Sequence, residues 1–386
     1  MLPVVPIQAT EGATRKTFWL ISSSEKVLFY FLATVTVFVF AYGTYERFAR
    51  YAEGNADWFD RLDGLGKRIT SAAKIVASNE KQFNRDLVGG LMHAFILWGF
   101  LTLLIATTIL FIDEWFRVFT TLMGEHQSFW VGDFYLSYQL VTDALGLLFI
   151  VGLAVALWRR YVARTDRLHG KHTNWEDDFL VWSLFLLGAG GFFLEGLRIV
   201  GSGQPIVTVE PVSFVGTATA LGLAAVGIDT SAAATIYPFA WWSHALLAFL
   251  FIAVIPYAKP FHMISSFANV VTRDEKAGAR LPGIPSDLDA TNAESIDDFT
   301  WKEMLDQDAC TKCGRCSSVC PAKASGRPLD PRDVILDLKQ YRESLEREGG
   351  ETKEIVADGG GVIDAKTMES CMSCMACMDA CPVEIE

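Results

Sequence analysis

Eight cysteines lie near the end of this 386-residue sequence, in two groups with identical spacing. In each group three cysteines are separated by two residues, and a fourth follows after three more residues and directly precedes a proline. The groups are Cys310, Cys313, Cys316 and Cys320-Pro321, then Cys371, Cys374, Cys377 and Cys381-Pro382. Closely spaced thiolates of this kind hold the irons of [4Fe–4S] clusters. A zinc site would more often use two CxxC pairs, and a disulfide framework would scatter its cysteines along the chain.

This spacing is typical of bacterial two-cluster ferredoxins, in which the fourth cysteine of each run serves the other cluster. We therefore expect one cluster on Cys310, Cys313, Cys316 and Cys381, and the other on Cys371, Cys374, Cys377 and Cys320. Fifty residues separate the two groups. Asp330-Pro331 predicts the start of an amphipathic helix that runs to about Arg347, followed by a hairpin or loop at Gly359–Gly361.

The preceding part of the chain predicts a membrane protein. Hydrophobic residues make up 51% of the sequence and charged residues only 20%. A transmembrane helix needs about 20 consecutive apolar residues. Five windows approach or exceed that length: Val27–Tyr45, Leu87–Ile112, Phe134–Trp158, Phe179–Val200 and Tyr237–Tyr257. A further stretch, Phe214–Ile228, is too short for a full span, so we expect an interfacial or re-entrant helix there.

The loops between these windows differ in positive charge, which predicts their side of the membrane. Loop 46–86 has eight Lys and Arg residues and loop 159–176 has five, whereas loop 113–133 has one and loop 201–236 has none. Loops rich in Lys and Arg stay in the cytoplasm. We therefore expect a multi-pass protein of the cell membrane, with the N-terminus outside and the cysteines in the cytoplasm. A sixth crossing would place the cysteines outside, where iron–sulfur clusters are rarely assembled.

The formal net charge of −12 is concentrated in the C-terminal part of the chain. From residue 270 onward there are 14 Lys and Arg against 24 Asp and Glu. This acidity argues against a nucleic-acid partner, which would need a basic surface. The expected fold is an all-α membrane bundle of five transmembrane helices plus a small, mainly α-helical C-terminal ferredoxin-type iron–sulfur domain. The expected segments are an outer N-terminal segment (1–26), the membrane domain (27–268), a linker (269–300) and the two-cluster domain (301–386).

Three histidines fall within or at the ends of the predicted spans: His93, His244 and His262. A lone histidine in a membrane helix more often makes a hydrogen bond between helices than binds a cofactor. His244 and His262, however, are 18 residues apart, so on one continuous helix they would share a face and lie about 27 Å apart. That is the layout needed to hold haem near either membrane surface. His93 and His262 would both lie at the cytoplasmic side, where two imidazoles could ligate one b-type haem.

The run from His244 to His262, which ends Pro-Tyr-Ala-Lys-Pro-Phe-His, resembles the last helix of the nitrate reductase gamma-subunit family of cytochromes b. That family includes the membrane subunits of the heterodisulfide reductase type. The resemblance covers about residues 20–270 and implies a haem on His93 and His262. The long spacer between the cysteine groups is similar to that of the iron–sulfur subunits of succinate dehydrogenase and heterodisulfide reductase.

Two features depart from these families. Leu103 stands where two-haem members carry another histidine, so an outer haem with His244 as one ligand stays open. His126 in the outer loop is an alternative second ligand, although an exposed loop histidine is the simpler interpretation. In fused heterodisulfide reductase-like proteins, cysteine-rich catalytic domains often follow the second cysteine group. We therefore expect either that this catalytic part is another polypeptide or that the sequence is a fragment.

Ionisable residues inside the spans are candidates for function, because burying a charge in lipid is costly. Asp143 lies about ten residues into the third span, and Glu195 and Arg198 lie one turn apart near the outer end of the fourth. The simpler interpretation is an ion pair that joins helices. The functional interpretation is a quinone site near the outer surface, because a quinone takes up two protons with two electrons and needs an acid close by. The family resemblance favours the quinone site.

Together these features predict a chain of electron carriers: a membrane quinone, haem b, two cytoplasmic [4Fe–4S] clusters and a soluble redox partner. The resemblance implies a heterodisulfide reductase-like subunit or an electron-transfer flavoprotein as that partner. The chain would then be a quinone-linked oxidoreductase subunit. One alternative is a membrane anchor and electron relay for a soluble oxidoreductase, with no quinone site of its own. Another is a transporter or sensor with regulatory clusters and no haem.

Overall fold

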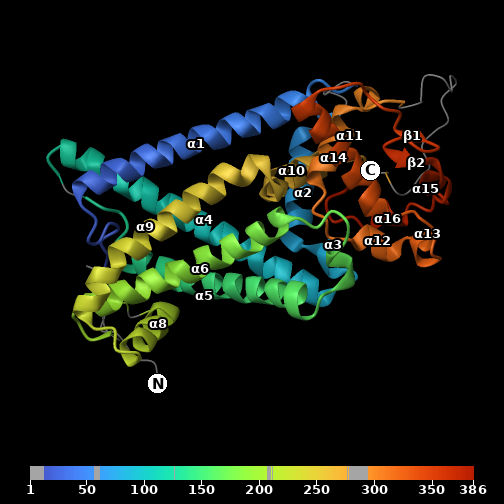
Figure 1. The fold of residues 1–386 in the computed structure, drawn as a ribbon. Helices are drawn as coiled ribbons and strands as arrows, with labels where there is room; N and C mark the ends of the chain where they lie inside the picture. The colour runs from blue at the N-terminus through green and yellow to red at the C-terminus, as the bar shows by residue number, and fades with distance from the viewer. Residues whose placement is uncertain are drawn as a thin grey trace. The chain divides into compact units, whose positions relative to one another are not determined.

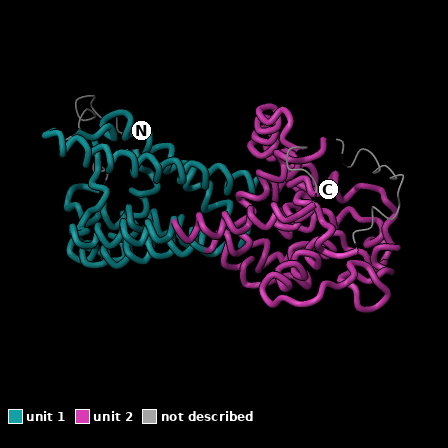
Figure 2. Tube along the Cα trace, turned by 90° about the horizontal axis from the view of Figure 1, so that it is seen from above, with its two compact units in different colours: residues 1–37, 91–157, 181–253 teal, residues 38–90, 158–180, 254–386 magenta. Residues whose placement is uncertain are grey.

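The computed structural model describes residues 13–55, 61–125, 127–206, 210, 212–275, 277 and 294–386. The chain forms two compact units, each assembled from separate parts of the sequence (Figure 2). Unit 1 contains residues 1–37, 91–157 and 181–253, and unit 2 contains residues 38–90, 158–180 and 254–386. Unit 1 therefore holds most of the predicted spans, and unit 2 holds all eight cysteines.

Among the described residues, five helices are long and apolar enough to cross a membrane, which confirms the predicted number of spans (Figure 1). They are α1 (Ser23–Tyr51), α4 (Leu87–Leu122), α5 (Gly132–Leu157) with a π-helical extension (Trp158–Val162), α6 (Trp175–Gly201) and α9 (Thr230–Val254) with a following 3-10 turn (Ile255–Tyr257). The predicted all-α membrane bundle is therefore present.

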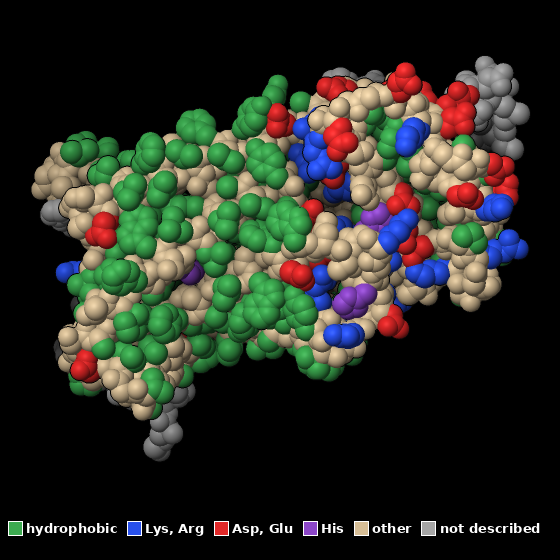
Figure 3. All heavy atoms as spheres, in the orientation of Figure 1, with side chains coloured by type: hydrophobic (Ala, Val, Ile, Leu, Met, Phe, Trp, Pro, Cys, Tyr) green, Lys and Arg blue, Asp and Glu red, His purple; other side chains and the backbone are tan. Residues whose placement is uncertain are grey.

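Large apolar side chains dominate the surface of unit 1. Phe31, Phe239 and Leu122 expose 63%, 75% and 81% of their surface. Figure 3 shows hydrophobic side chains spread over the visible face of unit 1, whereas charged side chains gather over unit 2. A soluble protein rarely exposes such extended apolar surface. In a bilayer this exposure has no cost, because the lipid tails are as apolar as the side chains. A helix also satisfies its own backbone hydrogen bonds and needs no water there.

The core of unit 1 forms where α8 (Phe214–Ala225) packs against α6 and α9. Leu197 of α6, Ala220 of α8 and Tyr237 of α9 are buried together. With 12 residues, α8 is too short to cross a bilayer, as the sequence predicted. Its N-terminus also contacts α5, which brings the third and fourth spans to the same short helix.

The last spanning helix does not continue to His262, so the prediction that His244 and His262 share one helix face is wrong. Two 3-10 turns, which contain Pro256 and Pro260, separate α9 from α10 (His262–Val271). Proline has no N–H for the helical hydrogen bond and disfavours helical geometry in the residue before it. The helix is interrupted for this reason, and a period of 3.6 residues does not relate the two histidines.

Unit 2 packs short helices around α10. Its remaining elements are α2 (Leu65–Ser78), α3 (Glu80–Phe83), 3-10 turns (Asp166–Leu168, Lys259–Phe261 and Ile296–Asp298), α11 (Trp301–Ala309), α12 (Arg315–Val319), α13 (Pro321–Ala324), α14 (Pro331–Glu348), β1 (Val356–Ala357), β2 (Ile363–Asp364), α15 (Ala365–Glu369) and α16 (Ala376–Asp379). α10 contacts α2 and α11, α11 contacts α14, and α12 contacts α14 and α16. Residues 276 and 278–293 of the predicted linker lie outside the described residues.

The spacer between the two cysteine groups contains α14 and a two-stranded sheet, which lie between the short helices α13 and α15. The Asp330 carboxylate caps α14 by accepting a hydrogen bond from the Arg332 N–H, and Pro331 is the first helical residue, as predicted. β1 and β2 pair in parallel, with Val356 opposite Ile363. The glycine-rich segment between them is therefore a loop and not the turn of an antiparallel hairpin.

Candidate redox sites

The two cysteine groups lie in loops with the same backbone conformation. In the first loop Lys312 and Gly314 have φ angles of 56° and 69°, and in the second Ser373 and Met375 have φ angles of 51° and 59°. These are equivalent positions in the two runs, and each loop leads into a short helix, α12 or α16. Residues that alternate between left- and right-handed conformations turn their N–H groups to one side and form a cradle for an anion. Each loop is thus shaped to surround a negatively charged cluster.

Cys381 of the second run lies beside the first group. It is buried together with Ala309, the residue before Cys310. Burial raises the pKa of the Cys381 thiol, and the nearby Cys313 and Cys310 raise it further. Burial likewise raises the pKa of Cys316 to about 12, with added effects from the same two thiols. Cys316 and Cys381 therefore each lie near Cys310 and Cys313, with which the sequence predicts that they share a cluster.

The second group is the more exposed of the two. Cys371 and Cys374 are exposed, and Met372 between them exposes 65% of its surface. Cys320, the proposed fourth ligand of this cluster, is buried, and α12, which precedes it, contacts α16. Among the described residues, no three His, Cys, Asp or Glu side chains surround a single metal-ion position. Cys371 and Cys374 are therefore more exposed than Cys310, Cys313 and Cys316 of the first group.

The first group is tied to the loop that follows the third span. Arg167 donates a hydrogen bond to the carbonyl oxygen of Cys313 at 2.6 Å, and its other terminal nitrogen bonds Asp86. A Cβ at Gly314 would overlap the Arg167 carbonyl oxygen, so this close approach requires glycine. The Arg159 guanidinium also bonds Asp86 and holds the pKa of that carboxyl well below its usual value. Arg167 is therefore fixed beside the first cysteine group.

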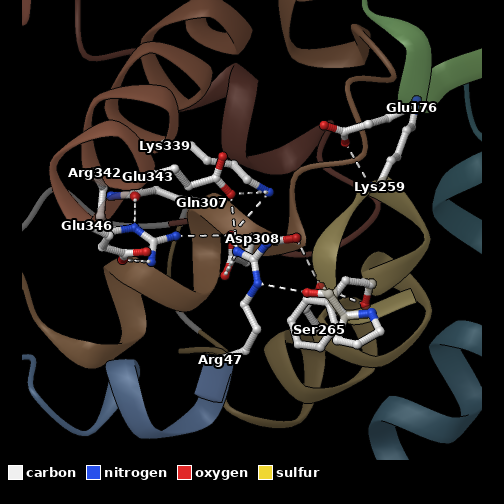
Figure 4. Close-up of polar contacts among 12 residues, drawn as sticks. Arg47, Glu176, Lys259, Ser265, Gln307, Asp308, Lys339, Arg342, Glu343 and Glu346 are labelled. Carbon is white, nitrogen blue, oxygen red and sulfur yellow. Dashed lines mark hydrogen bonds and ion pairs between the residues drawn. The ribbon is translucent and has the colours of Figure 1, made fainter. Parts of the chain in front are cut away.

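A buried carboxylate two residues before the first cysteine joins this domain to the end of α1. Asp308 has no exposed side-chain surface, and Figure 4 shows it at the centre of a polar cluster. It accepts hydrogen bonds from Arg47 at 3.2 Å, Arg342 at 3.0 Å and Tyr51 at 2.5 Å, and Lys339 lies 3.1 Å away. Although burial raises it, the cations Lys339 and Arg342 bring the pKa of Asp308 well below its usual value. Sequence reasoning missed this residue.

α10 makes a second connection to the iron–sulfur domain. The Ser265 hydroxyl donates to the Asp308 carbonyl oxygen at 3.0 Å. The fully buried Asn269 amide donates to the Asp306 carboxylate at 2.7 Å and to the Val383 carbonyl oxygen at 2.8 Å. Both ends of the cluster-binding region are therefore bonded to one face of α10.

His262 opens α10 and is held in one tautomer. Its Nδ1 lies 2.7 Å from the Lys259 carbonyl oxygen, so Nδ1–H donates and Nε2 keeps its lone pair. Burial lowers the pKa of His262 to about 4, so the ring is neutral at ordinary pH. Within the described part of the chain, Nε2 has no hydrogen-bond partner. A neutral imidazole oriented through its other nitrogen is the state that iron ligation requires.

The other predicted haem residues belong to unit 1. His93 lies in the second turn of α4. His244 of α9 has a buried Nδ1 without a hydrogen-bond partner among the described residues, and a Cβ at Gly190 of α6 would lie 3.0 Å from this nitrogen. Gly190 thus makes room for the imidazole ring. His126 lies outside the described residues.

Two of the predicted membrane acids meet at the start of α8. Asp143 is buried, and its Oδ2 accepts a hydrogen bond of 2.7 Å from the Val215 N–H. The Ser213 hydroxyl oxygen lies 3.1 Å from both Asp143 oxygens and 3.1 Å from Glu195 Oε1. The structure therefore connects Asp143 with Glu195 through a single hydroxyl group.

Arg198, the third predicted residue, faces two carboxylates. Its Nη2 lies 2.5 Å from Glu210 Oε1 and 3.8 Å from Glu195 Oε1. Tyr135 donates to the other Glu210 oxygen at 2.6 Å, and Arg15 lies 3.7 Å from Glu195. The sequence does not mark Glu210 and Arg15 as candidates. Both lie outside the predicted spans, and a charged residue is unusual only within a span. The predicted pair of charges is thus part of a larger buried cluster.

Comparison with known proteins identifies the C-terminal region. Residues 309–385 match the family model of the 4Fe-4S dicluster domain, which includes all eight cysteines. The chain therefore contains a domain for two iron–sulfur clusters, as predicted, and each cube would take four of the eight thiolates. No solved structure matches the chain.

Three curated proteins are similar to longer parts of the chain. The "EtfAB:quinone oxidoreductase" of Syntrophomonas wolfei is 28% identical over 93% of this chain and 52% of its own length. The "probable iron-sulfur-binding oxidoreductase FadF" of Bacillus subtilis is 26% identical over 82% of this chain and 43% of its own. The "probable membrane-anchored ferredoxin" of Chromohalobacter salexigens is 34% identical over 47% and 29%. The chain spans about half or less of the length of these relatives.

Proposed function

We propose that this chain is a membrane-bound electron-transfer oxidoreductase subunit that links the quinone pool, through haem b, to two cytoplasmic [4Fe–4S] clusters and a soluble redox partner. The observation that carries the proposal is the combination, on one chain, of five membrane-spanning helices and a 4Fe-4S dicluster domain. The contact of Arg167 with Cys313 supports electron transfer between the membrane part and the first cluster, because it fixes that cysteine loop beside a loop that joins two spans.

In this proposal the two clusters have different neighbours. The cluster near the ends of the membrane-spanning helices is held by Cys310, Cys313, Cys316 and Cys381. The more exposed cluster is held by Cys371, Cys374, Cys377 and Cys320. The exposure of Cys371 and Cys374 supports the second cluster as the contact point for the soluble partner. The relative named EtfAB:quinone oxidoreductase supports an electron-transfer flavoprotein as this partner and a quinone as the membrane substrate. A heterodisulfide reductase-like subunit is the second candidate partner.

The proposed location is the cell membrane, with the N-terminus outside and residues 301–386 in the cytoplasm. The basic loops 46–86 and 159–176 belong to the same compact unit as the cysteines, which supports a common side of the membrane for all three. In this arrangement residues 27–268 form the membrane domain, 1–26 the outer segment and 269–300 the linker.

The haem in this proposal is held by His262 and His93. The fixed tautomer of His262 fits an axial ligand, as does its Nε2, which has no partner in the described part of the chain, and bound haem would carry single electrons between quinone and clusters. His244 fits a ligand of a second haem through its unpartnered Nδ1, but the residue at the position of a partner histidine is Leu103.

Replacing His262 with alanine tests this ligand. We expect His262→Ala to lose the b-type absorbance of the purified protein while its cluster iron is unchanged, because one axial nitrogen is removed and the cysteines are intact. His169→Ala is a suitable control, because this histidine lies in the basic cytoplasmic loop. Full haem content in His262→Ala would exclude His262 as a ligand.

A quinone site at Asp143, Glu195 and Arg198 distinguishes this function from a pure electron relay. The observation that favours the relay is that Arg198 and Glu195 already have partners within the protein.

In the experiment that distinguishes the two functions, the clusters are reduced with a viologen dye, a short-chain quinone is added and cluster reoxidation is followed. We expect Asp143→Asn and Glu195→Gln to slow reoxidation about a hundredfold, since each removes a group able to transfer protons. Asp133→Asn is the control, because Asp133 is exposed and lies on α5, the same helix as Asp143. Wild-type rates in Asp143→Asn, Glu195→Gln and Arg198→Gln would favour the relay.

A further inference from the structure

The short helix α8 is capped in an unusual way, and this frees a hydroxyl group inside the membrane domain. Ser213 occupies the N-cap position, but its side chain makes no capping hydrogen bond. Asp143 of α5 takes that role by accepting from the Val215 N–H at 2.7 Å. A serine at an N-cap normally satisfies such an N–H itself. Because Asp143 replaces it, the Ser213 hydroxyl is available to the two carboxyl groups beside it.

The three groups are held together at close range. A Cβ at Gly216 would lie 2.5 Å from Ser213 Oγ and 2.6 Å from Glu195 Cδ, so only glycine permits this approach. Ser213 Oγ lies 3.1 Å from Asp143 Oδ1 and 3.1 Å from Glu195 Oε1. The line from Asp143 through Ser213 to Glu195 is therefore continuous within hydrogen-bond distance.

The two contacts of Ser213 can both be hydrogen bonds only when one of the two acids carries a proton. A hydroxyl group has one hydrogen and can donate it to only one carboxylate, whereas an ionised carboxylate can only accept. Ser213 contacts two carboxyl groups, so the second contact is a hydrogen bond only if that carboxyl is protonated and donates to the serine oxygen. One shared proton satisfies both contacts.

Counting the charges of the cluster also indicates one bound proton. Three carboxyl groups, those of Asp143, Glu195 and Glu210, lie with two guanidinium groups, those of Arg15 and Arg198. Fully ionised, the cluster would hold one uncompensated negative charge in a membrane domain, which is costly. One proton makes it neutral.

The position of the proton follows from the partners of each acid. Glu195 faces both guanidinium groups and Glu210 is paired with Arg198, so positively charged groups lie beside both of these acids. Asp143 has no Lys or Arg within ion-pair distance among the described residues. Asp143 is also the more buried acid of the connected pair, because Asp143 is buried whereas Glu195 is partly exposed.

We infer that Asp143 is a proton store that delivers its proton through Ser213 to Glu195, the more exposed end of the relay. This inference rests on the proposed quinone site and names its proton donor. The Asp143 O–H bond breaks as its proton moves to Ser213, and the Ser213 proton moves at the same time to Glu195. Glu195 then passes this proton to a quinone that takes up two electrons from the reduced clusters. The second proton comes from water.

Infrared spectroscopy tests the stored proton without turnover. We expect the resting full-length protein at neutral pH to show a protonated-carboxyl C=O band that disappears in Asp143→Asn and is only shifted in Glu195→Gln. Absence of the band from the wild-type protein, or its survival unchanged in Asp143→Asn, would overturn the inference. A wild-type protein that shows the band but never passes electrons to quinone would instead overturn the proposed function alone.

Removal of the bridging hydroxyl tests the relay. We expect Ser213→Ala to keep the carboxyl band and the cluster content but to slow quinone-driven cluster reoxidation about a hundredfold. Thr219→Val is the matched control, because among the described residues the Thr219 hydroxyl on the same helix bonds only the Val215 carbonyl oxygen of that helix. Equal rates in Ser213→Ala and Thr219→Val would contradict the relay.

Discussion

Replacing Cys381 with serine is expected to remove the cluster of the first cysteine group, although Cys381 belongs to the second run of the sequence. The thiol of Cys381 lies close enough to Cys310 and Cys313 to raise its pKa, and it is buried beside Ala309. A [4Fe–4S] cube needs four ligands, so loss of one thiolate destabilises the whole cluster. We expect iron content to fall from about eight to about four atoms per chain.

To show which cluster is lost in Cys381→Ser, this variant is compared with variants of the first three cysteines of each run, which belong to a known cluster. Electron paramagnetic resonance of reduced Cys381→Ser is expected to match that of Cys313→Ser and to differ from that of Cys374→Ser. Cys320→Ser provides the reciprocal test and is expected to match Cys374→Ser. If Cys381→Ser matched Cys374→Ser instead, each cluster would be held by one run of the sequence, contrary to the exchange proposed above.

The second large effect is expected at Asp308, which bonds the iron–sulfur domain to the end of α1. Asp308→Asn keeps the size of the side chain but leaves Arg47, Arg342 and Lys339 without the charge that compensates them. Removing one partner from a buried charge cluster costs about 3–5 kcal/mol. We therefore expect a large fall in the thermal unfolding midpoint of unit 2 in detergent, followed by circular dichroism and by loss of cluster absorbance.

Glu343 supplies the matched control for this substitution. It contacts the same Arg47, at 3.1 Å, and Lys339, but 30% of its side chain is exposed (Figure 4). An exposed ion pair contributes about 0–1 kcal/mol, so Glu343→Gln is expected to change the midpoint little. Equal midpoints for Asp308→Asn and Glu343→Gln would show that the buried carboxylate does not hold the domain in place.

Those parts of the fold that depend on local sequence were predicted well. Each span was visible as a run of apolar residues long enough for a bilayer, and α8 was recognised as too short. The start of α14 followed from Asp330 and Pro331, since a capping acid and a proline at the first position are local signals. The dicluster domain followed from cysteine spacing, because the ligands of each loop are close in sequence.

Other features depend on contacts between distant residues and could not be predicted. Nothing in the sequence marks Asp308 among the acids of an acidic tail, and its role depends on Arg47, more than 200 residues earlier. Ser213 resembles an ordinary N-cap until Asp143 from another helix takes over the capping hydrogen bond. The interruption before His262 has a local signal in Pro256 and Pro260, and these prolines outweigh the helical spacing of the two histidines.

The most direct test of the proposed electron path is an oxidised-minus-reduced visible spectrum of the purified full-length protein, with haem and iron quantified per chain. We expect about eight cluster irons and one b-type haem that is reduced together with the clusters. A second haem would add His244 as a ligand. About eight cluster irons without haem would leave a membrane-anchored iron–sulfur protein and would contradict the link between quinone and clusters through haem b.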